Sequence, residues 1–232
     1  MATFIGDATQ TSPSLVSNGA QRQARLSLDG SLITADWVQA AIAEGIMHGV
    51  NTGTGTAPDT FNATYAAAEQ DIYIFVPEGV VIIPTYIGVV FEDTGTAQVL
   101  DVFAAYSSNG DSAVTGDART IYNVHTLASP GSACTATAVV TGSGATHLGG
   151  TDFLEFWRPY AGFGEDAFAG STAATMRGQF SVSSAHWSAK SYIAPIIGAA
   201  DTACALSVYA AAQAGLGFIT VEWAEYPAAR FP

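Results

Sequence analysis

Short apolar runs, separated by turn residues, follow one another from residue 71 to the C-terminus. Each run is rich in β-branched and aromatic residues, which is typical of strands. The runs span residues 72–76, 80–91, 98–106, 119–127, 133–141, 152–158, 175–183, 191–197, 204–210 and 218–226. Short strands at this spacing indicate a sandwich or barrel, and no long helices alternate with them as in a doubly wound fold. The pattern therefore predicts an all-β domain of nine or ten antiparallel strands.

The first 70 residues have a different pattern. Residues 1–32 are polar without a sustained period, which predicts an extended arm. Residues 35–44 predict one short helix that carries Trp37, Val38, Ala41 and Ile42 on one face. Thr34 or Asp36 is the expected N-cap, and Gly45 the expected end. The sequence thus divides into an arm, helix and loop over residues 1–70 and a sandwich domain over residues 71–232.

Two predicted strands have apolar residues at both odd and even positions, namely residues 80–91 and 206–212. Such strands are usually buried on both faces, which in a sandwich requires another element or another subunit on the outer face. Alanine and threonine also tolerate exposure, so an exposed outer face is the alternative. Pro84 predicts an edge position or a bulge, because proline cannot donate to a sheet ladder.

The composition points towards assembly. Hydrophobic residues make up 49% of the chain and charged residues only 12%, against about 25% in ordinary soluble domains. A soluble monomer needs a charged and mixed surface. We therefore expect much of this surface to be covered by further copies or by partners.

The charge balance excludes several partners. Twenty acidic residues face seven basic ones, so the net charge is −13, and Lys190 is the single lysine. Phosphate contacts need clustered basic residues, so no direct contact with nucleic acid is expected. No apolar run approaches the ~20 residues of a membrane-spanning helix, and the first ten residues do not resemble a secretory signal. Membrane insertion is therefore not expected.

Motifs that carry chemistry are missing from the sequence. There is no phosphate-binding loop, dinucleotide fingerprint, zinc-protease motif or serine elbow. The histidines, His48, His125, His147 and His186, show no ligand spacing. Cys134 and Cys204 lie in apolar surroundings and are expected to be free and buried, with a disulfide as the alternative. We expect no cofactor, no metal and no catalytic residue.

Carboxylate pairs leave an enzymatic alternative open. The pairs are Glu92 with Asp93, Glu165 with Asp166, and Glu222 with Glu225. Two carboxylates across a cleft suit glycoside hydrolysis, with Glu222 or Glu155 as the acting residue. Solvated acids at turns explain the same pattern, and that interpretation is favoured here.

Aromatic residues are densest around residues 153–168, where they surround Arg158. The cluster contains Phe153, Phe156, Trp157, Tyr160, Phe163 and Phe168. It is either a core strand with a packed loop or an anchor between subunits, since aromatic residues and arginine are favoured at interface centres. The same rings are also suited to stacking on sugars.

Three segments carry a resemblance to a known class of proteins. They are residues 74–93, with a strand, a Pro-Glu-Gly turn and a long strand ending in acids, the closing segment 217–227, and residues 25–37 before the helix. They resemble structural proteins of bacterial viruses. The resemblance implies a jelly-roll-like β-sandwich in the virion, either in the capsid shell or decorating it, and it brings no catalytic residues.

The sequence thus predicts a non-enzymatic virion structural protein that forms a homo-oligomer, expected to be a trimer, and contacts other capsid proteins. Residues expected at the assembly interface are Arg22, Arg25, Trp37, Trp157, Arg158, Tyr160, Phe163 and Phe168. The alternative function is a carbohydrate-binding module or receptor-binding spike that uses the same aromatic residues.

Overall fold

The computed structural model describes most of the chain from Asp36 onward. The described residues are 36–62, 69–93, 100–125, 131–141, 153–161, 183–210 and 215–231. The expected N-terminal arm therefore lies outside the described residues.

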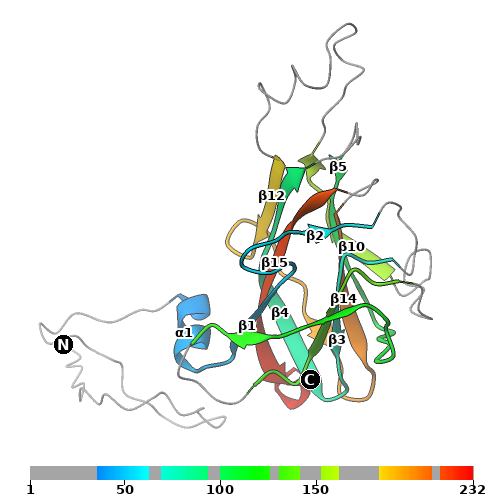
Figure 1. Ribbon diagram of the computed structural model, residues 1–232. Helices are drawn as coiled ribbons and strands as arrows, with labels where there is room; N and C mark the ends of the chain where they lie inside the picture. The colour runs from blue at the N-terminus through cyan, green and yellow to red at the C-terminus, as the bar shows by residue number, and fades with distance from the viewer. Residues whose placement is uncertain are drawn as a thin grey trace, which may run out of the picture.

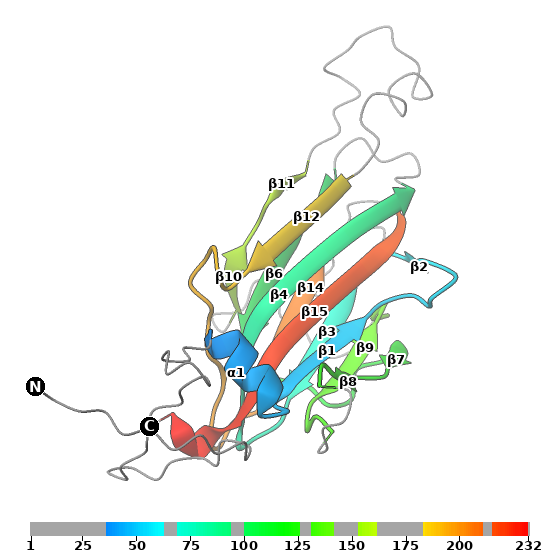
Figure 2. The same cartoon turned by 90° about the vertical axis from the view of Figure 1, so that its left-hand side faces the viewer.

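The first sheet contains five strands in one path and two short additional strands. Its order is β12 (Ser183–Ser188), β4 (Val80–Asp93), β15 (Leu216–Pro227), β1 (Met47–Asn51) and β8 (Tyr122–Asn123), while β13 (Ile197–Gly198) pairs with β4 and β2 (Asp59–Thr60) with β15. The pairings are antiparallel throughout. The two long strands β4 and β15 form the centre of this sheet (Figure 2).

The second sheet has six strands and faces the first. Its order is β10 (Phe153–Trp157), β6 (Phe103–Ser107), β14 (Cys204–Tyr209), β3 (Ile72–Val76), β9 (Thr135–Ala138) and β7 (Asp117–Arg119). A separate pair joins β5 (Leu100–Asp101) and β11 (Tyr160–Ala161). The two large sheets pack face to face (Figure 1), so the all-β sandwich predicted from the sequence is confirmed.

The strand order identifies the sandwich as a jelly roll. Eight of the described strands form its framework, in chain order β1, β3, β4, β6, β10, β12, β14 and β15. Numbered one to eight along the chain, they lie in the order 1-8-3-6 in the first sheet and 2-7-4-5 in the second. Successive strands therefore alternate between the sheets, except that the fourth and fifth, β6 and β10, pair within the second sheet, as in the two Greek keys of a jelly roll.

The space between the sheets is filled by large apolar side chains. Trp187 and Trp223 are fully buried there, together with Ile74, Val89 and Leu206. Each side chain alternates with an outward residue along its strand, as the two-residue period of a strand requires. This continuous core holds both sheets in place.

Pro84 lies in a central strand and is accommodated by a bulge. Across from it, Glu222 pairs with Tyr86 and Trp223 with Pro84, so Thr85 is the extra residue in β4. On its other side, β4 pairs with β13 up to Ile82 and with β12 from Tyr86. The proline thus occupies a gap between these partners, where its missing N–H breaks no ladder bond.

The single α-helix among the described residues is α1 (Trp37–Ala43), which covers one end of the first sheet (Figure 2), and a 3-10 helix, η2 (Ala228–Arg230), follows β15. Asp36 caps it by accepting the Val38 N–H at 3.2 Å, and Gly45 ends it with a φ of 73°. Ala41 packs with Met47 and Ala224 on the outer face of that sheet. The predicted helix is confirmed, with Asp36 as its N-cap.

The outer face of the second sheet is buried along its central strand β14. All six residues of β14 are inaccessible, although alternate ones point away from the core. On that face the Tyr73 hydroxyl accepts the Asp111 N–H at 2.7 Å. The chain itself therefore covers this face, and no second subunit is needed to explain its apolar residues.

Two expectations about element positions are corrected. Residues 191–197, expected as a strand, leave the sheet in a turn after β12, and only Ile197 of this stretch is in a strand. Strands β1 and β2 belong to the first sheet, so the sandwich begins before residue 71 and the expected boundary at residue 70 falls inside it. The sequence pattern did not predict β12, although Ala185 and Trp187 point inward and alternate with polar residues, which is the two-residue period of a strand.

Candidate subunit interface

Exposed apolar side chains lie on helix α1 and on the loop that follows β12. Ile193 is 95% exposed, Tyr192 56% and Ile196 54%, and Trp37 at the start of the helix is 42% exposed. We call these four residues the α1–loop surface. Large exposed apolar patches on folded proteins mark interaction sites more often than scattered single residues do.

Helix and loop are joined by an ion pair. Lys190 Nζ lies 3.4 Å from Asp36 Oδ2, so the residue that caps α1 also holds the start of the loop. Both groups are partly exposed to solvent, and the pair therefore positions the loop more than it stabilises the fold. Figure 2 shows α1 and the segment that follows β12 next to each other.

Local hydrogen bonds explain why the chain leaves the sheet here. The Ser188 carbonyl accepts the N–H groups of Ser191 at 2.9 Å and Tyr192 at 3.1 Å, and its hydroxyl accepts the Lys190 N–H at 3.2 Å. This turn directs Tyr192 and Ile193 away from the sandwich. Ala194 packs back on the core and anchors the loop.

The apolar character of these residues gives the surface its driving force. Burying a large aliphatic or aromatic side chain contributes about 1.5–3 kcal/mol. Ile193 contributes most, because almost all of its surface is available for burial.

The predicted interface residues fall into three groups. Trp37 lies on the α1–loop surface. Arg22, Arg25, Phe163 and Phe168 lie outside the described residues, as does the side chain of Tyr160, whose backbone forms β11 with β5. Trp157 and Arg158 are described, and they lie in different environments.

Trp157 belongs to the core and not to an interface. Its side chain is only 6% exposed and packs in the main apolar cluster between the sheets. The register shift between Glu155 and Trp157 turns the indole inward at the end of β10. Trp157 therefore does not offer a ring to a second subunit or to a sugar.

Arg158 lies on the outer face of the second sheet. Its guanidinium carbon lies 4.4 Å from the centre of the Phe103 ring, and Nε and Nη2 donate to Glu155 at 2.8 and 2.6 Å. Phe103 in turn stacks on Tyr209 with ring centres 4.5 Å apart. Arg158 therefore covers an aromatic group within its own chain, which occupies the contacts it would offer to a partner.

Of the predicted carboxylate pairs, Glu222 and Glu225 are described on both sides, and they do not form the pair that glycoside hydrolysis requires. Glu222 points outward from the first sheet, whereas Glu225 accepts hydrogen bonds from Ser132 Oγ at 2.5 Å and the Ala133 N–H at 2.9 Å. Glu155 is bound to Arg158. Glu165 and Asp166 lie outside the described residues. Glu222 and Glu225 therefore do not face a common cleft.

Cys134 and His48 both interact with the charge of Glu225, but the pKa shifts of the two groups oppose nucleophilic chemistry. Burial raises the pKa of the Cys134 thiol, and the charge of Glu225 raises it further. Burial lowers the pKa of His48, partly offset by Glu225. A reactive cysteine needs a lowered thiol pKa beside a protonated histidine. Cys134 and Cys204 are both free and buried, as predicted.

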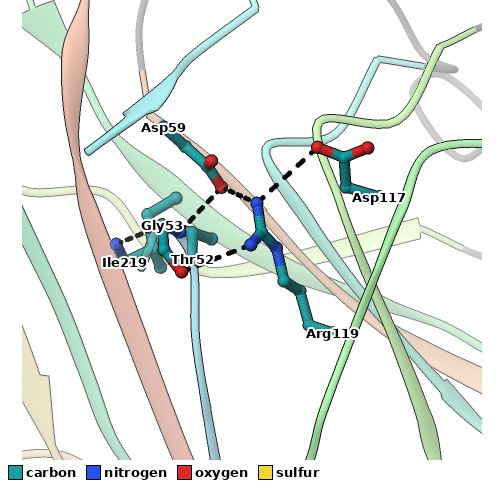
Figure 3. A network of polar contacts seen from close by, with 6 residues as sticks. All are labelled: Thr52, Gly53, Asp59, Asp117, Arg119 and Ile219. Carbon is teal, nitrogen blue, oxygen red and sulfur yellow. Dashed lines mark hydrogen bonds and ion pairs between the residues drawn. The ribbon is translucent and has the colours of Figure 1, made fainter. Parts of the chain in front are cut away.

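A polar network fastens one edge of the sandwich (Figure 3). Arg119 of β7 forms an ion pair with Asp59 of β2 and donates to the Gly53 carbonyl at 3.2 Å. Asp59 also accepts the Gly53 N–H at 2.8 Å, and Asp117 lies 3.7 Å from the guanidinium. Since β7 and β2 belong to different sheets, this network links the two layers. The terminal nitrogens of Arg119 find their partners within the chain, whereas Nε is buried without a hydrogen-bond partner among the described residues. We interpret the network as a structural link.

Sequence reasoning missed Tyr192, Ile193 and Ile196. They were expected in a strand, because a short apolar run has the same composition in a strand and in an exposed binding loop. The available signal was the polar stretch Ser188 to Ser191 before them, which favours a turn.

Comparison with known proteins gives no relative: no family model, curated protein or solved structure matches the chain. Within the described ranges no helix is long and apolar enough to cross a membrane. The same part of the chain holds no group of three or more histidine, cysteine or acidic side chains arranged to bind a metal ion.

Proposed function

We propose that the chain is a non-enzymatic structural protein of a virion, forming or decorating an icosahedral capsid through contacts between its own copies. The observation that carries this proposal is the α1–loop surface, on a chain with only 12% charged residues. A jelly roll is one of the folds from which viral capsids are built, which supports the proposal without being specific to it.

Ile193 lies on a loop that is held in a fixed position, which favours a specific contact with another copy over incidental exposure. The loop is held by the ion pair between Lys190 and Asp36 and by the turn at Ser188, so its apolar side chains are presented in a fixed place. A fixed surface loses little conformational entropy on association. In a closed ring, such as the trimer we propose, this surface would contact a different face of the next copy.

The charge of the chain supports a place away from the genome. A net charge of −13 repels packaged nucleic acid, so an outer layer or a shell separated from the genome fits best. Other capsid proteins are then the expected further partners, and the virion is the expected location.

The proposal is tested by measuring the mass of the purified chain by light scattering, with Ile193→Asp as the variant. Wild type is expected to form trimers or larger assemblies, and the variant to dissociate at least tenfold more readily, because a carboxylate in an apolar contact is costly to desolvate. Thr56→Asp, at an exposed position in the loop between β1 and β2, is the matched control and should assemble as wild type does.

Removing residues 1–32 tests the expected arm, including Arg22 and Arg25. We expect the truncated chain to assemble more weakly than the full chain. A wild-type protein that stays monomeric over the accessible concentration range would overturn the structural role.

A further inference from the structure

The outer face of the first sheet carries two tyrosines that lie over glycines. A Cβ added to Gly49 would lie 2.6 Å from Cζ of Tyr122, and one added to Gly88 would lie 2.8 Å from Cζ of Tyr86. Each ring thus occupies the space above a strand backbone where a side chain would otherwise stand. Both rings are partly exposed.

The strand register places a carboxylate between the two rings. Tyr122 is opposite Gly49, Gly49 is opposite Glu222, and Glu222 is opposite Tyr86. These residues form one row across β8, β1, β15 and β4. Three interstrand steps of about 4.8 Å separate the two tyrosine backbones, so the row is about 14 Å long.

The neighbouring row supplies hydrogen-bonding groups. Asn51 is opposite Thr220, and Thr220 is opposite Gly88, which is opposite His186. Thr220 Oγ1 donates to Asn51 Oδ1 at 2.8 Å, and the Asn51 side chain also forms a hydrogen bond with the side chain of Tyr122. We call Tyr86, Tyr122, Glu222, Asn51 and Thr220 the tyrosine platform.

We infer that the tyrosine platform binds a neutral oligosaccharide. Sugar rings present apolar C–H faces, whose positive hydrogens suit the negative face of an aromatic ring, and hydroxyls that suit carboxylate and amide partners. Two rings with a carboxylate between them match this alternation of surfaces. The length of the row favours a chain of sugars over a monosaccharide.

Charge and polarity narrow the class of ligand. Glu222 is the charged group at the centre of the row, and on a chain of net charge −13 it disfavours sialylated, sulfated or phosphorylated ligands. Burial raises the pKa of Glu222, and burial together with the charge of Glu222 raises that of Tyr122. A protein partner is less suited, since the centres of protein interfaces are depleted of acidic residues.

Within the described residues, Asn51 is exposed, and the other platform residues, Tyr86, Tyr122, Thr220 and Glu222, are partly exposed. α1 covers the end of the sheet at Met47 and Ala224, one step beyond the row that contains Gly49 and Glu222 (Figure 2). The tyrosine platform and the α1–loop surface are therefore different surfaces. Glycan binding does not require assembly, and each property can be lost without the other.

The test is isothermal titration of the full-length protein with four neutral hexasaccharides: cellohexaose, xylohexaose, maltohexaose and chitohexaose in its N-acetylated form. Wild type is expected to bind at least one of them. Tyr86→Ala and Tyr122→Ala should each weaken binding at least tenfold, whereas Tyr192→Ala, an exposed tyrosine on the α1–loop surface, should leave it unchanged.

The tyrosine rings also cover backbone, so loss of binding in the alanine variants can result from unfolding. A further variant that keeps both rings controls for this effect. Thr220→Arg keeps both tyrosines and places a long side chain across the platform beside Glu222, so binding should fall at least tenfold in a protein that melts like wild type. The inference is overturned if wild type binds none of the four sugars at millimolar concentration. It is equally overturned if binding survives Thr220→Arg.

Discussion

The carboxylate of Asp71 accepts the backbone N–H of Ala210, 139 positions further along the chain, at 2.7 Å. Its other oxygen accepts the N–H of Asn62 at 2.6 Å. Asp71 precedes β3, and Ala210 follows β14, so one buried side chain closes the ends of two paired strands and the segment after β2. The buried Asp71 carboxylate therefore accepts backbone N–H groups at these strand ends, as a backbone carbonyl does in a turn.

Replacing Asp71 should destabilise the fold in a graded way. Asp71→Asn puts an N–H₂ group against one of the two N–H donors, and Asp71→Ala leaves both donors without a partner. An unsatisfied buried donor costs about 1–3 kcal/mol, so we expect about 2 kcal/mol for the first variant and more for the second. Urea unfolding measures both. Asp201→Asn, at an exposed position, is the control and should change stability little.

The same residue predicts a pH dependence. Burial, as the largest cause, raises the pKa of Asp71 to about 7, although the two N–H donors oppose this. An unfolded aspartate titrates near 3.9, so between about pH 4 and pH 7 the folded state holds more protons and stability falls as pH rises. The loss ends above pH 7 and amounts to at most about 4 kcal/mol. Urea unfolding at several pH values should show this fall in wild type and not in Asp71→Asn; parallel curves would contradict it.

The link between the sheets predicts a measurable coupling between Arg119 and Asp59. The two side chains are 16% and 15% exposed, so removing one partner leaves the other poorly solvated. We expect Arg119→Met to cost about 2 kcal/mol, between the values of exposed and buried pairs. A double-mutant cycle with Asp59→Asn measures the coupling. Arg158→Met, whose pair with Glu155 is much more exposed, should cost less than about 1 kcal/mol.

These contacts show which parts of the fold can be predicted from sequence. The runs at Ile72–Val76, Cys204–Tyr209 and Leu216–Pro227 were predictable, because apolar runs of strand length between turn residues favour strands. Strand β1 was not, since Met47, His48 and Gly49 lack β propensity and gain their place from pairing with β15. Tertiary pairing of this kind is invisible in a single sequence.

The candidate sites depend even more on pairing. The row of Tyr122, Gly49, Glu222 and Tyr86 combines residues from four strands, and only the register brings them together. Composition did indicate assembly, because a shortage of charge is a property of the whole surface. Composition could not say where the apolar surface lies, and Trp157, in the densest aromatic cluster of the sequence, is buried in the core.

The two cysteines should be unreactive in the folded protein. Both are 5% exposed, and burial raises the pKa of each thiol, with the charge of Glu225 adding to the effect at Cys134. A thiol reacts as its thiolate, so both should resist Ellman's reagent at pH 8 and react fully in urea. Rapid reaction of either thiol in the native protein would show that its part of the core opens readily.

Salt dependence distinguishes two ways in which copies of this chain could associate. Subunits of net charge −13 repel one another, and the screening length falls from about 10 Å at 0.1 M salt to about 3 Å at 1 M. If the α1–loop surface drives assembly, added salt removes the repulsion and leaves the apolar contact, so assemblies should strengthen as sodium chloride rises. If Arg22 and Arg25 instead pair with acidic groups of a neighbour, the same salt should weaken them. Light scattering at fixed protein concentration from 0.05 to 1 M salt separates these outcomes, and Ile193→Asp should abolish the salt-strengthened association in the first case alone.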